Sequence, residues 1–294
     1  MKRTIHPSIS FAAVMALLFA KASHAADLRP ETVSAWEQYI QGKNAAFKLS
    51  AEAPWVTNDN RHDCALLRSL KILIAPAGPN IPKRVSGGLI HDWIGTAFIP
   101  NATISQVLAA VRDYDRYKDL YRPGVVDSKL VSSGDDQDRF SLLLMNKAII
   151  IRKAFEGDYR ASYFRIDDRR WYSVAESTRV QEVDDYGGPN ERLLPVDQGA
   201  GLIWRVRSIT KYEERDEGVF MQMEVIVLSR DVPNALRWIA NPIVRRVSRD
   251  SLQLSLEQTR GAVQSNVASH VAGLGHAFKT VPGLNAGAAF LLGE

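Results

Sequence analysis

The sequence predicts an α+β fold, with a large antiparallel sheet in the middle of the chain and one long helix after it. Between residues 125 and 230, β-type stretches alternate with turn signals at hairpin spacing, and no stretch has a clear helical period. A helix with its own start signal precedes this series, and a long segment with an apolar face follows it. Successive strands that short turns connect pair antiparallel, so the series is expected to be a meander.

The N-terminus has the pattern of a secretory signal peptide over residues 1–25. Lys2 and Arg3 precede an apolar run at 11–20, which is shorter than the roughly 20 residues that span a bilayer. Small residues at Ser23 and Ala25 suit cleavage before Ala26, and an uncleaved membrane anchor is the alternative. We therefore expect a periplasmic or secreted protein, with no stable membrane insertion after cleavage.

The positive charge of the chain belongs largely to this segment. Cleavage removes three of the 37 Lys+Arg residues and none of the 33 Asp+Glu residues, so the net charge falls from +4 to +1. A nearly neutral mature chain lacks the basic surface that nucleic-acid binding requires, and no nucleic-acid partner is expected. Apolar residues at 46% and charged residues at 24% are typical of a soluble globular domain and exclude a disordered chain.

Residues 26–86 form an N-terminal extension before the regular part of the chain. An amphipathic helix is predicted over residues 31–41, a strand over 70–75 and a loop rich in Pro and Gly over 76–86. The apolar positions of this helix are Val33, Trp36, Tyr39 and Ile40. Cys64 is the one cysteine of the chain, so it forms no intramolecular disulfide and is expected to be a small buried side chain.

The regular part begins with a strand over 88–100, in which Gly95 suggests a bulge. Thr103 and Gln106 have the spacing of a capping box, so a helix is expected to start there and to end before Pro123. The predicted strands of the meander are 125–132, 140–145, 149–156, 159–166, 171–183, 202–212 and 219–229. Pro233 suits the first turn of the closing helix, which Pro242 is expected to kink. A flexible tail is predicted over residues 265–294.

Residues 87–264 resemble a START-like domain of the helix-grip (SRPBCC) superfamily, which includes polyketide cyclases. More narrowly, they are similar to exported bacterial START-like proteins of unassigned function. The motifs that carry the resemblance are GLIHDWIG at 88–95, Asp113-Tyr114 with Tyr121-Arg122-Pro123, Ser177-Thr178-Arg179, Gly201 to Arg205, and Leu228 to Pro233. The resemblance implies a curved antiparallel sheet wrapped on the long C-terminal helix, with an apolar cavity between them.

One long helix cannot fill the wide concave face of a curved sheet, so the residues themselves also favour a gap there. Gaps of this kind are typical ligand sites. The side chains predicted to bind a hydrophobic small molecule or lipid are Trp93, Tyr114, Tyr121, Trp204 and Ser208. In the strand over 202–212, alternation places Trp204 and Ser208 on the inner face and Arg205, Arg207 and Lys211 toward solvent. The inner face of the strand over 219–229 stays undetermined.

The function predicted from these observations is carriage or sensing of a hydrophobic molecule without catalysis, cofactor or metal. No P-loop, dinucleotide-binding glycine fingerprint, HExxH, paired CxxC or GxSxG motif occurs. His270 and His276 have no acidic or cysteine neighbours that would suggest a metal site. One alternative is a cyclase- or hydrolase-like enzyme that uses His91, which cannot form a dyad with Asp92 because strand neighbours point to opposite faces. A second alternative is a periplasmic protein-interaction module.

Overall fold

The computed structural model describes residues 26–50, 61–134, 137–148, 151–215, 217–231 and 237–279. The predicted signal peptide and residues 280–294 lie outside these ranges. The helices are α2 (Pro30–Ser50), α3 (Arg61–Arg68), α4 (Ile104–Val111), the 3-10 helix η2 (Tyr114–Arg116), α5 (Tyr117–Leu120) and α6 (Arg237–Lys279). The strands are β1 (Ala26–Asp27), β2 (Leu73–Pro76), β3 (Lys83–Val85), β4 (Gly88–Pro100), β5 (Val125–Ser133), β6 (Gln137–Ala148), β7 (Ile151–Arg165), β8 (Arg170–Asp184), β9 (Arg192–Leu193), β10 (Gln198–Gly199), β11 (Arg205–Arg215) and β12 (Gly218–Arg230).

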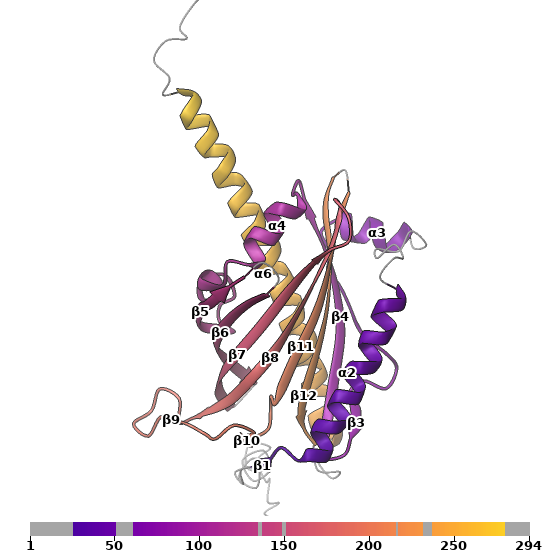
Figure 1. The fold of residues 1–294 in the computed structure, drawn as a ribbon, viewed down its shortest axis with the longest axis vertical. Coiled ribbons are helices and arrows are strands. Elements are labelled where there is room, and N and C mark those ends of the chain that lie inside the picture. Colours follow the sequence, from indigo (N-terminus) through magenta and orange to yellow (C-terminus); the bar gives the residue numbers. More distant parts are fainter. Residues whose placement is uncertain are drawn as a thin grey trace, which may run out of the picture.

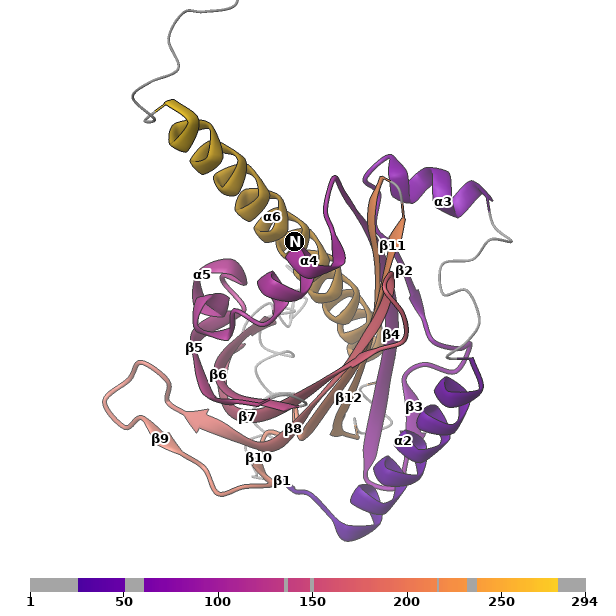
Figure 2. The ribbon, with the colours of Figure 1, turned by 45° about the horizontal axis from the view of Figure 1, so that its top comes forward.

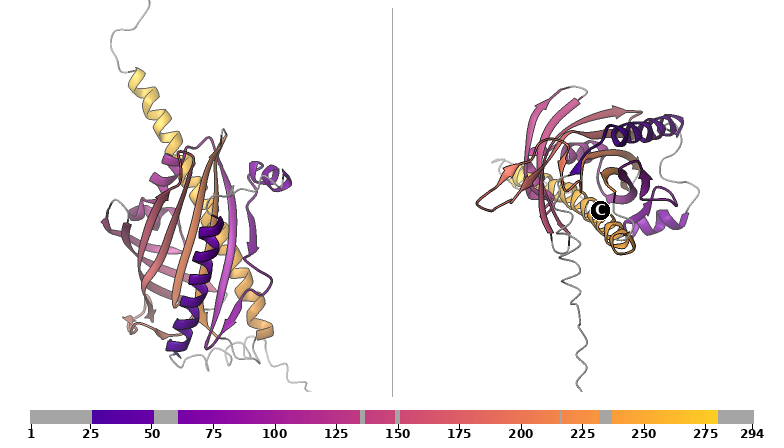
Figure 3. Two further views of the ribbon diagram at one scale, coloured as in Figure 1. Left: turned by 45° about the vertical axis from the view of Figure 1, so that its right-hand side comes forward. Right: turned by 90° about the horizontal axis from the view of Figure 1, so that it is seen from below.

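One antiparallel sheet runs in the order β2-β4-β12-β11-β8-β7-β6-β5, with β3 added to β4 and β9 added to β8. The sheet is curved, and α4, α5 and α6 lie on its concave side (Figures 1 and 2). Helix α2 lies against the opposite, convex side (Figure 3). The predicted α+β fold, a curved antiparallel sheet wrapped on a long C-terminal helix in the helix-grip manner, is therefore confirmed.

The strand over 88–100 has the predicted bounds. The strands predicted over 149–156 and 159–166 form a single strand, β7. Gly157 and Asp158, which were expected to form a turn, lie inside the continuous strand β7. Asp158 pairs with Arg179 and Tyr159 pairs with Ser177, so the register shifts there and Thr178 of β8 is the extra residue of a β-bulge. Glycine and aspartate are common in turns, but here both residues pair with strands on either side, which local sequence does not reveal.

Gly95 does not mark a bulge, because β4 pairs with β12 through Gly95 without a register shift. A Cβ at Gly95 would lie 2.5 Å from the Leu256 side chain and 3.0 Å from that of Leu252, both on α6. The glycine therefore allows α6 to approach the concave face closely at β4.

Helix α4 begins with the predicted capping box. Thr103 Oγ1 accepts from the Gln106 amide at 3.4 Å, and Gln106 Oε1 accepts from the Thr103 amide at 2.9 Å. Helix α6 contains Pro242 and continues to Lys279, through part of the range predicted as a flexible tail. Its buried side chains Leu252, Leu256 and Val263 pack in one cluster with α4, β4 and β12.

Strand register assigns the two faces of the sheet. Val219 and Met221 of β12 are buried in the concave cluster, and Met223 and Val225 pack against that cluster. This settles the inner face of the strand over 219–229. On the convex face, Trp36 of α2 packs with Ile90, Trp204, Ile226 and Leu228.

Helix α2 covers a part of β11 on the convex face that the sequence predicted to be exposed to solvent. Arg207 is only 9% exposed, and its guanidinium donates to Asn44 Oδ1 of α2 at 2.7 Å and to Glu176 Oε2 at 2.5 Å. The expectation that Arg207 faces solvent is therefore wrong, because α2 lies across this part of the sheet. Lys211 also has α2 above it, with its ammonium 5.2 Å from the centre of the Phe47 ring.

Candidate functional site

The middle of the concave face carries small side chains on three adjacent strands, β11, β8 and β7. Ser208 pairs with Ala175, Ala175 pairs with Ala161, and Thr210 pairs with Ser173. We call this surface the small-residue floor; it consists of Ala161, Ser173, Ala175, Ser177, Ser208 and Thr210. At about 4.8 Å between strands and about 3.4 Å per residue, it measures roughly 10 by 14 Å.

The floor is covered only in part: Ala161, Ser173 and Thr210 are buried, and the other three residues are not. Helix α6 makes its main contacts with β4, α4 and β2, toward one side of the sheet. Ser208, Ala175 and Ser177 are half-buried rather than buried, although they lie on the concave face. Side chains that project toward packed helices in a filled core are normally inaccessible. Their residual exposure indicates accessible space above the floor.

Aromatic side chains border this floor. Trp93, Tyr163 and Trp171 are half-buried and pack against the cluster that holds α6 on the sheet. Tyr117 and Tyr121, from α5 and the residue after it, pack against a second cluster formed by β5, β6 and β7. Aromatic rings offer large apolar contact surfaces with a polar tip, which is common in sites for apolar ligands.

A buried polar network fixes η2 and α4 to the sheet beside the floor. Asp138 is 1% exposed and accepts from Arg112 Nε at 2.9 Å and Arg112 Nη2 at 3.0 Å. Tyr114 donates to the same carboxylate at 3.2 Å and lies 2.8 Å from the Tyr163 hydroxyl. Burial disfavours the ionised carboxylate, but the hydrogen bonds from Arg112 and Ser133 outweigh it and hold the pKa of Asp138 below its ordinary value.

The hydroxyl groups of three further tyrosines form hydrogen bonds that connect helices or strands to one another. Tyr117 donates to the Val111 carbonyl at 2.6 Å, and Tyr121 is 2.9 Å from Thr259 Oγ1 of α6. Tyr212 is 3.2 Å from Ser173 Oγ across the β11–β8 pair. Burial raises the pKa of each of these phenols, so all three remain protonated hydrogen-bond donors near neutral pH.

The structure places four of the five predicted ligand-binding residues on the concave side. Trp93 and Ser208 lie on the sheet itself, and Tyr114 and Tyr121 lie in the segment around α5. Trp204 lies elsewhere, in the cluster beneath α2 on the convex side. It precedes β11, so the alternation of that strand does not extend to it. Sequence reasoning did not identify Ser173, Ala175 or Ala161, because their proximity depends on the register of three strands.

His91 lies on the concave face at β4 and is 6% exposed. Its Nε2 is 2.9 Å from Ser229 Oγ, and burial lowers its pKa to about 4. Asp92 points to the other face, where it accepts from Tyr39, so the two side chains form no dyad, as the strand pattern predicted. A neutral, buried imidazole held by a serine is typical of a structural histidine.

The convex face holds a charged cluster beneath α2. The Lys43 ammonium is 2.6 Å from Asp92 Oδ2 and 2.5 Å from Glu224 Oε1, and Asp92 is fully buried. Tyr39 donates to the same Asp92 oxygen at 2.6 Å. Burial raises the pKa of Glu224 despite the nearby ammonium, and the negative charge of Asp92 adds to this effect. The cluster binds α2 to the sheet and does not face the floor.

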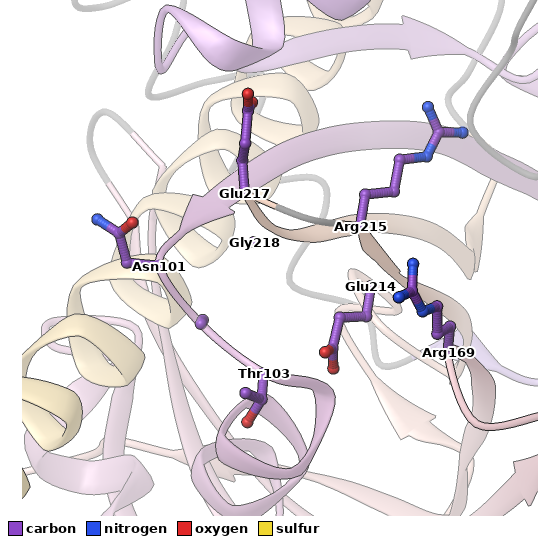
Figure 4. Close-up of a pocket in the computed structure, with 8 residues that line it drawn as sticks. Asn101, Thr103, Arg169, Glu214, Arg215, Glu217 and Gly218 are labelled. Carbon is purple, nitrogen blue, oxygen red and sulfur yellow. The ribbon is translucent and has the colours of Figure 1, made fainter.

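A separate polar pocket of about 220 Å³ lies where β11 and β12 meet the start of α4 (Figure 4). Glu214 reaches from β11 toward Thr103, and its Oε2 accepts from the Ile104 amide at 2.6 Å. Glu217 pairs with Arg68, and Arg215 pairs with Glu213. These pairings make the pocket part of the packing of α4 and α3 at this end of the sheet.

Among the described residues, no group of three or more His, Cys, Asp and Glu side chains is placed to hold a metal ion. No helix within the same ranges is both long enough and apolar enough to span a membrane.

Comparisons with known proteins give matches in structure alone. No family model and no curated protein matches the chain. It is similar to a STAR-related lipid transfer protein from Xanthomonas axonopodis, with 19% identity and a TM-score of 0.42, over 66% of this chain and 98% of that one. It is also similar to human STARD10, with 9% identity and a TM-score of 0.43, over 79% and 93% of the two chains.

A third similar structure is the Zhui aromatase/cyclase from a Streptomyces species, with 10% identity and a TM-score of 0.41, over 60% of this chain and 96% of that one. The assignment of the helix-grip fold to this chain rests on the strand order and on the position of α6.

Proposed function

We propose that the chain binds a hydrophobic small molecule of the lipid type, for carriage or sensing, between the sheet and α6. The observation that supports this most directly is the small-residue floor. Ser208, Ala175 and Ser177 project toward the helices yet keep part of their surface accessible. Aromatic rings border the floor, and such a lining is typical of apolar ligand sites.

The amount of apolar ligand surface that is buried determines how tightly such a ligand would be held. Burying about ten methylene groups at roughly 0.8 kcal/mol each gives about 8 kcal/mol before other costs. Association and the ordering of a flexible chain consume several kcal/mol of this gain. A moderate affinity with ready release follows, which suits a carrier or a sensor.

Catalysis is the alternative use of the same space, and it depends on His91. This imidazole is buried, bonded to Ser229, and has a pKa lowered to about 4. Such a group is a poor general base near neutral pH, because its affinity for a proton is low. The geometry therefore favours binding over a cyclase- or hydrolase-like reaction.

Export is part of the proposal. The signal-peptide pattern at residues 1–25 would place the mature protein in the periplasm or outside the cell. N-terminal sequencing of protein recovered from the periplasmic fraction would test this. A mature chain that begins at Ala26 is the expected result, and intact protein in the cytoplasm would contradict it.

Native mass spectrometry of the purified mature protein, followed by organic extraction, tests the binding function. A co-purifying apolar molecule with a mass that disappears on extraction is the expected result. A variant in which Ala175 is replaced by Phe would fill the floor and should lose the bound molecule. Protein that carries no extractable molecule and binds no apolar probe would contradict the proposed function.

A further inference from the structure

Tyr159 differs from the other tyrosines near the floor. It is 7% exposed, and its hydroxyl oxygen is buried without a hydrogen-bond partner among the described residues. The hydroxyls of Tyr114, Tyr117, Tyr121 and Tyr212 all have partners. An unpaired hydroxyl in an apolar surrounding is unfavourable, and phenylalanine in this position would avoid that cost.

The fold holds this side chain in a defined place. Tyr159 lies opposite the β-bulge at Thr178 of β8, pairs with Ser177 of the floor, and stacks on Phe140 with ring centres 5.3 Å apart. Its ring and hydroxyl lie over Gly157, where a Cβ would be 2.7 to 2.9 Å from them. The glycine therefore makes room for a phenol that projects over the concave face beside the floor.

Charge limits the kind of group that this phenol would bind. A buried carboxylate or phosphate needs a cation, and Arg112, which lies beside the concave tyrosines, is already held by both oxygens of Asp138. Burial raises the pKa of Tyr159, so its hydroxyl stays protonated and acts as a donor. Ser177, the residue that pairs with Tyr159 on β8, offers a second hydroxyl, since its Oγ accepts from the Val206 amide and can donate its own proton.

We propose that Tyr159 is a ligand-anchoring residue, whose hydroxyl donates to an uncharged oxygen (a ketone, ester or ether) of an apolar molecule bound over the small-residue floor. This inference rests on the proposed function and narrows its ligand class. The ligand would carry its polar atom against the sheet, inside the site, rather than only at the surface of the protein.

Two probes of closely similar shape test the proposal: 2-acetylnaphthalene, which has a ketone oxygen, and 2-isopropenylnaphthalene, which has a methylene group in its place. In Tyr159→Phe, we expect the affinity for the ketone to fall about tenfold and that for the hydrocarbon to change less than twofold. The urea midpoint of the variant should equal or exceed that of the wild type. Tyr172→Phe, on the convex face between Phe47 and Phe164, is the matched control and should change neither affinity.

Gly157→Ala is the second variant, because its methyl group would displace the hydroxyl and should produce the same selective loss. Ketone affinity that is unchanged, or both affinities weakened equally, would overturn the role of Tyr159 and leave the binding function standing. Failure of both probes to bind the wild-type protein would overturn the binding function and this inference with it.

Discussion

Replacing Ala175 with leucine decides whether the floor borders open space or a filled core. Ala175 lies at the centre of the floor, between Ser208 and Ala161, and is half-buried. Leucine adds three carbon atoms to this side chain. If they enter accessible space beneath α6, their burial stabilises the fold by about 2 kcal/mol, at roughly 0.8 kcal/mol per carbon. If the core is filled, overpacking destabilises the fold by about 1–3 kcal/mol.

Urea unfolding followed by circular dichroism measures this difference, and Ala97→Leu provides the matched control. Ala97 points to the same face but is fully buried in the cluster with Leu252 and Leu256. We expect Ala97→Leu to be destabilising and Ala175→Leu to be neutral or stabilising, with weaker binding of apolar probes. The reasoning about the floor would be refuted if both variants lost the same stability.

Three other predictions concern buried ionisable groups. Lys43→Met leaves Asp92 and Glu224 without their cation and should cost about 3–5 kcal/mol in urea unfolding, part of which Glu224→Gln should restore. Asp138→Asn weakens the bonds to Arg112 and should lower the free energy of unfolding by about 2 kcal/mol. The pKa of His91 is about 4 when folded and near 6.5 when unfolded, so the unfolded chain binds more protons between these values. Stability should therefore fall by about 3 kcal/mol as pH drops from 6.5 to 4, and His91→Gln should remove this loss in thermal melts at pH 7.5 and 4.5.

Features that depend on neighbouring residues were predictable from the sequence. The capping box of Thr103 and Gln106 needs only a spacing of three residues, and it occurs as expected. The strand over 88–100 has turn signals at both ends and the predicted bounds. The strands of the meander were predictable for the same reason, except that Gly157 and Asp158 predict a turn and lie inside β7.

Features that depend on distant segments were not predictable in this way. Arg207 is a charged residue on an alternating strand, which suggests exposure. Helix α2 covers it in the structure, and its guanidinium donates to Asn44, which is 163 residues away in the sequence. Trp204 was assigned by extending the alternation of β11 beyond its first residue, Arg205. The small-residue floor requires the register of three strands, and no single strand of the sequence reveals it.

The two faces of the sheet have different roles, and β4 connects them. Asp92 points outward to Lys43 and Tyr39, and the next residue, Trp93, points inward beside the floor. A strand is stiff between adjacent residues, so the ion pairs beneath α2 also hold Trp93 in place. Removing α2 would uncover Asp92, Ile226 and other buried groups of the sheet as well as freeing β4. The N-terminal extension therefore belongs to the scaffold that positions the binding face, even though the motifs that predict the fold begin only after it.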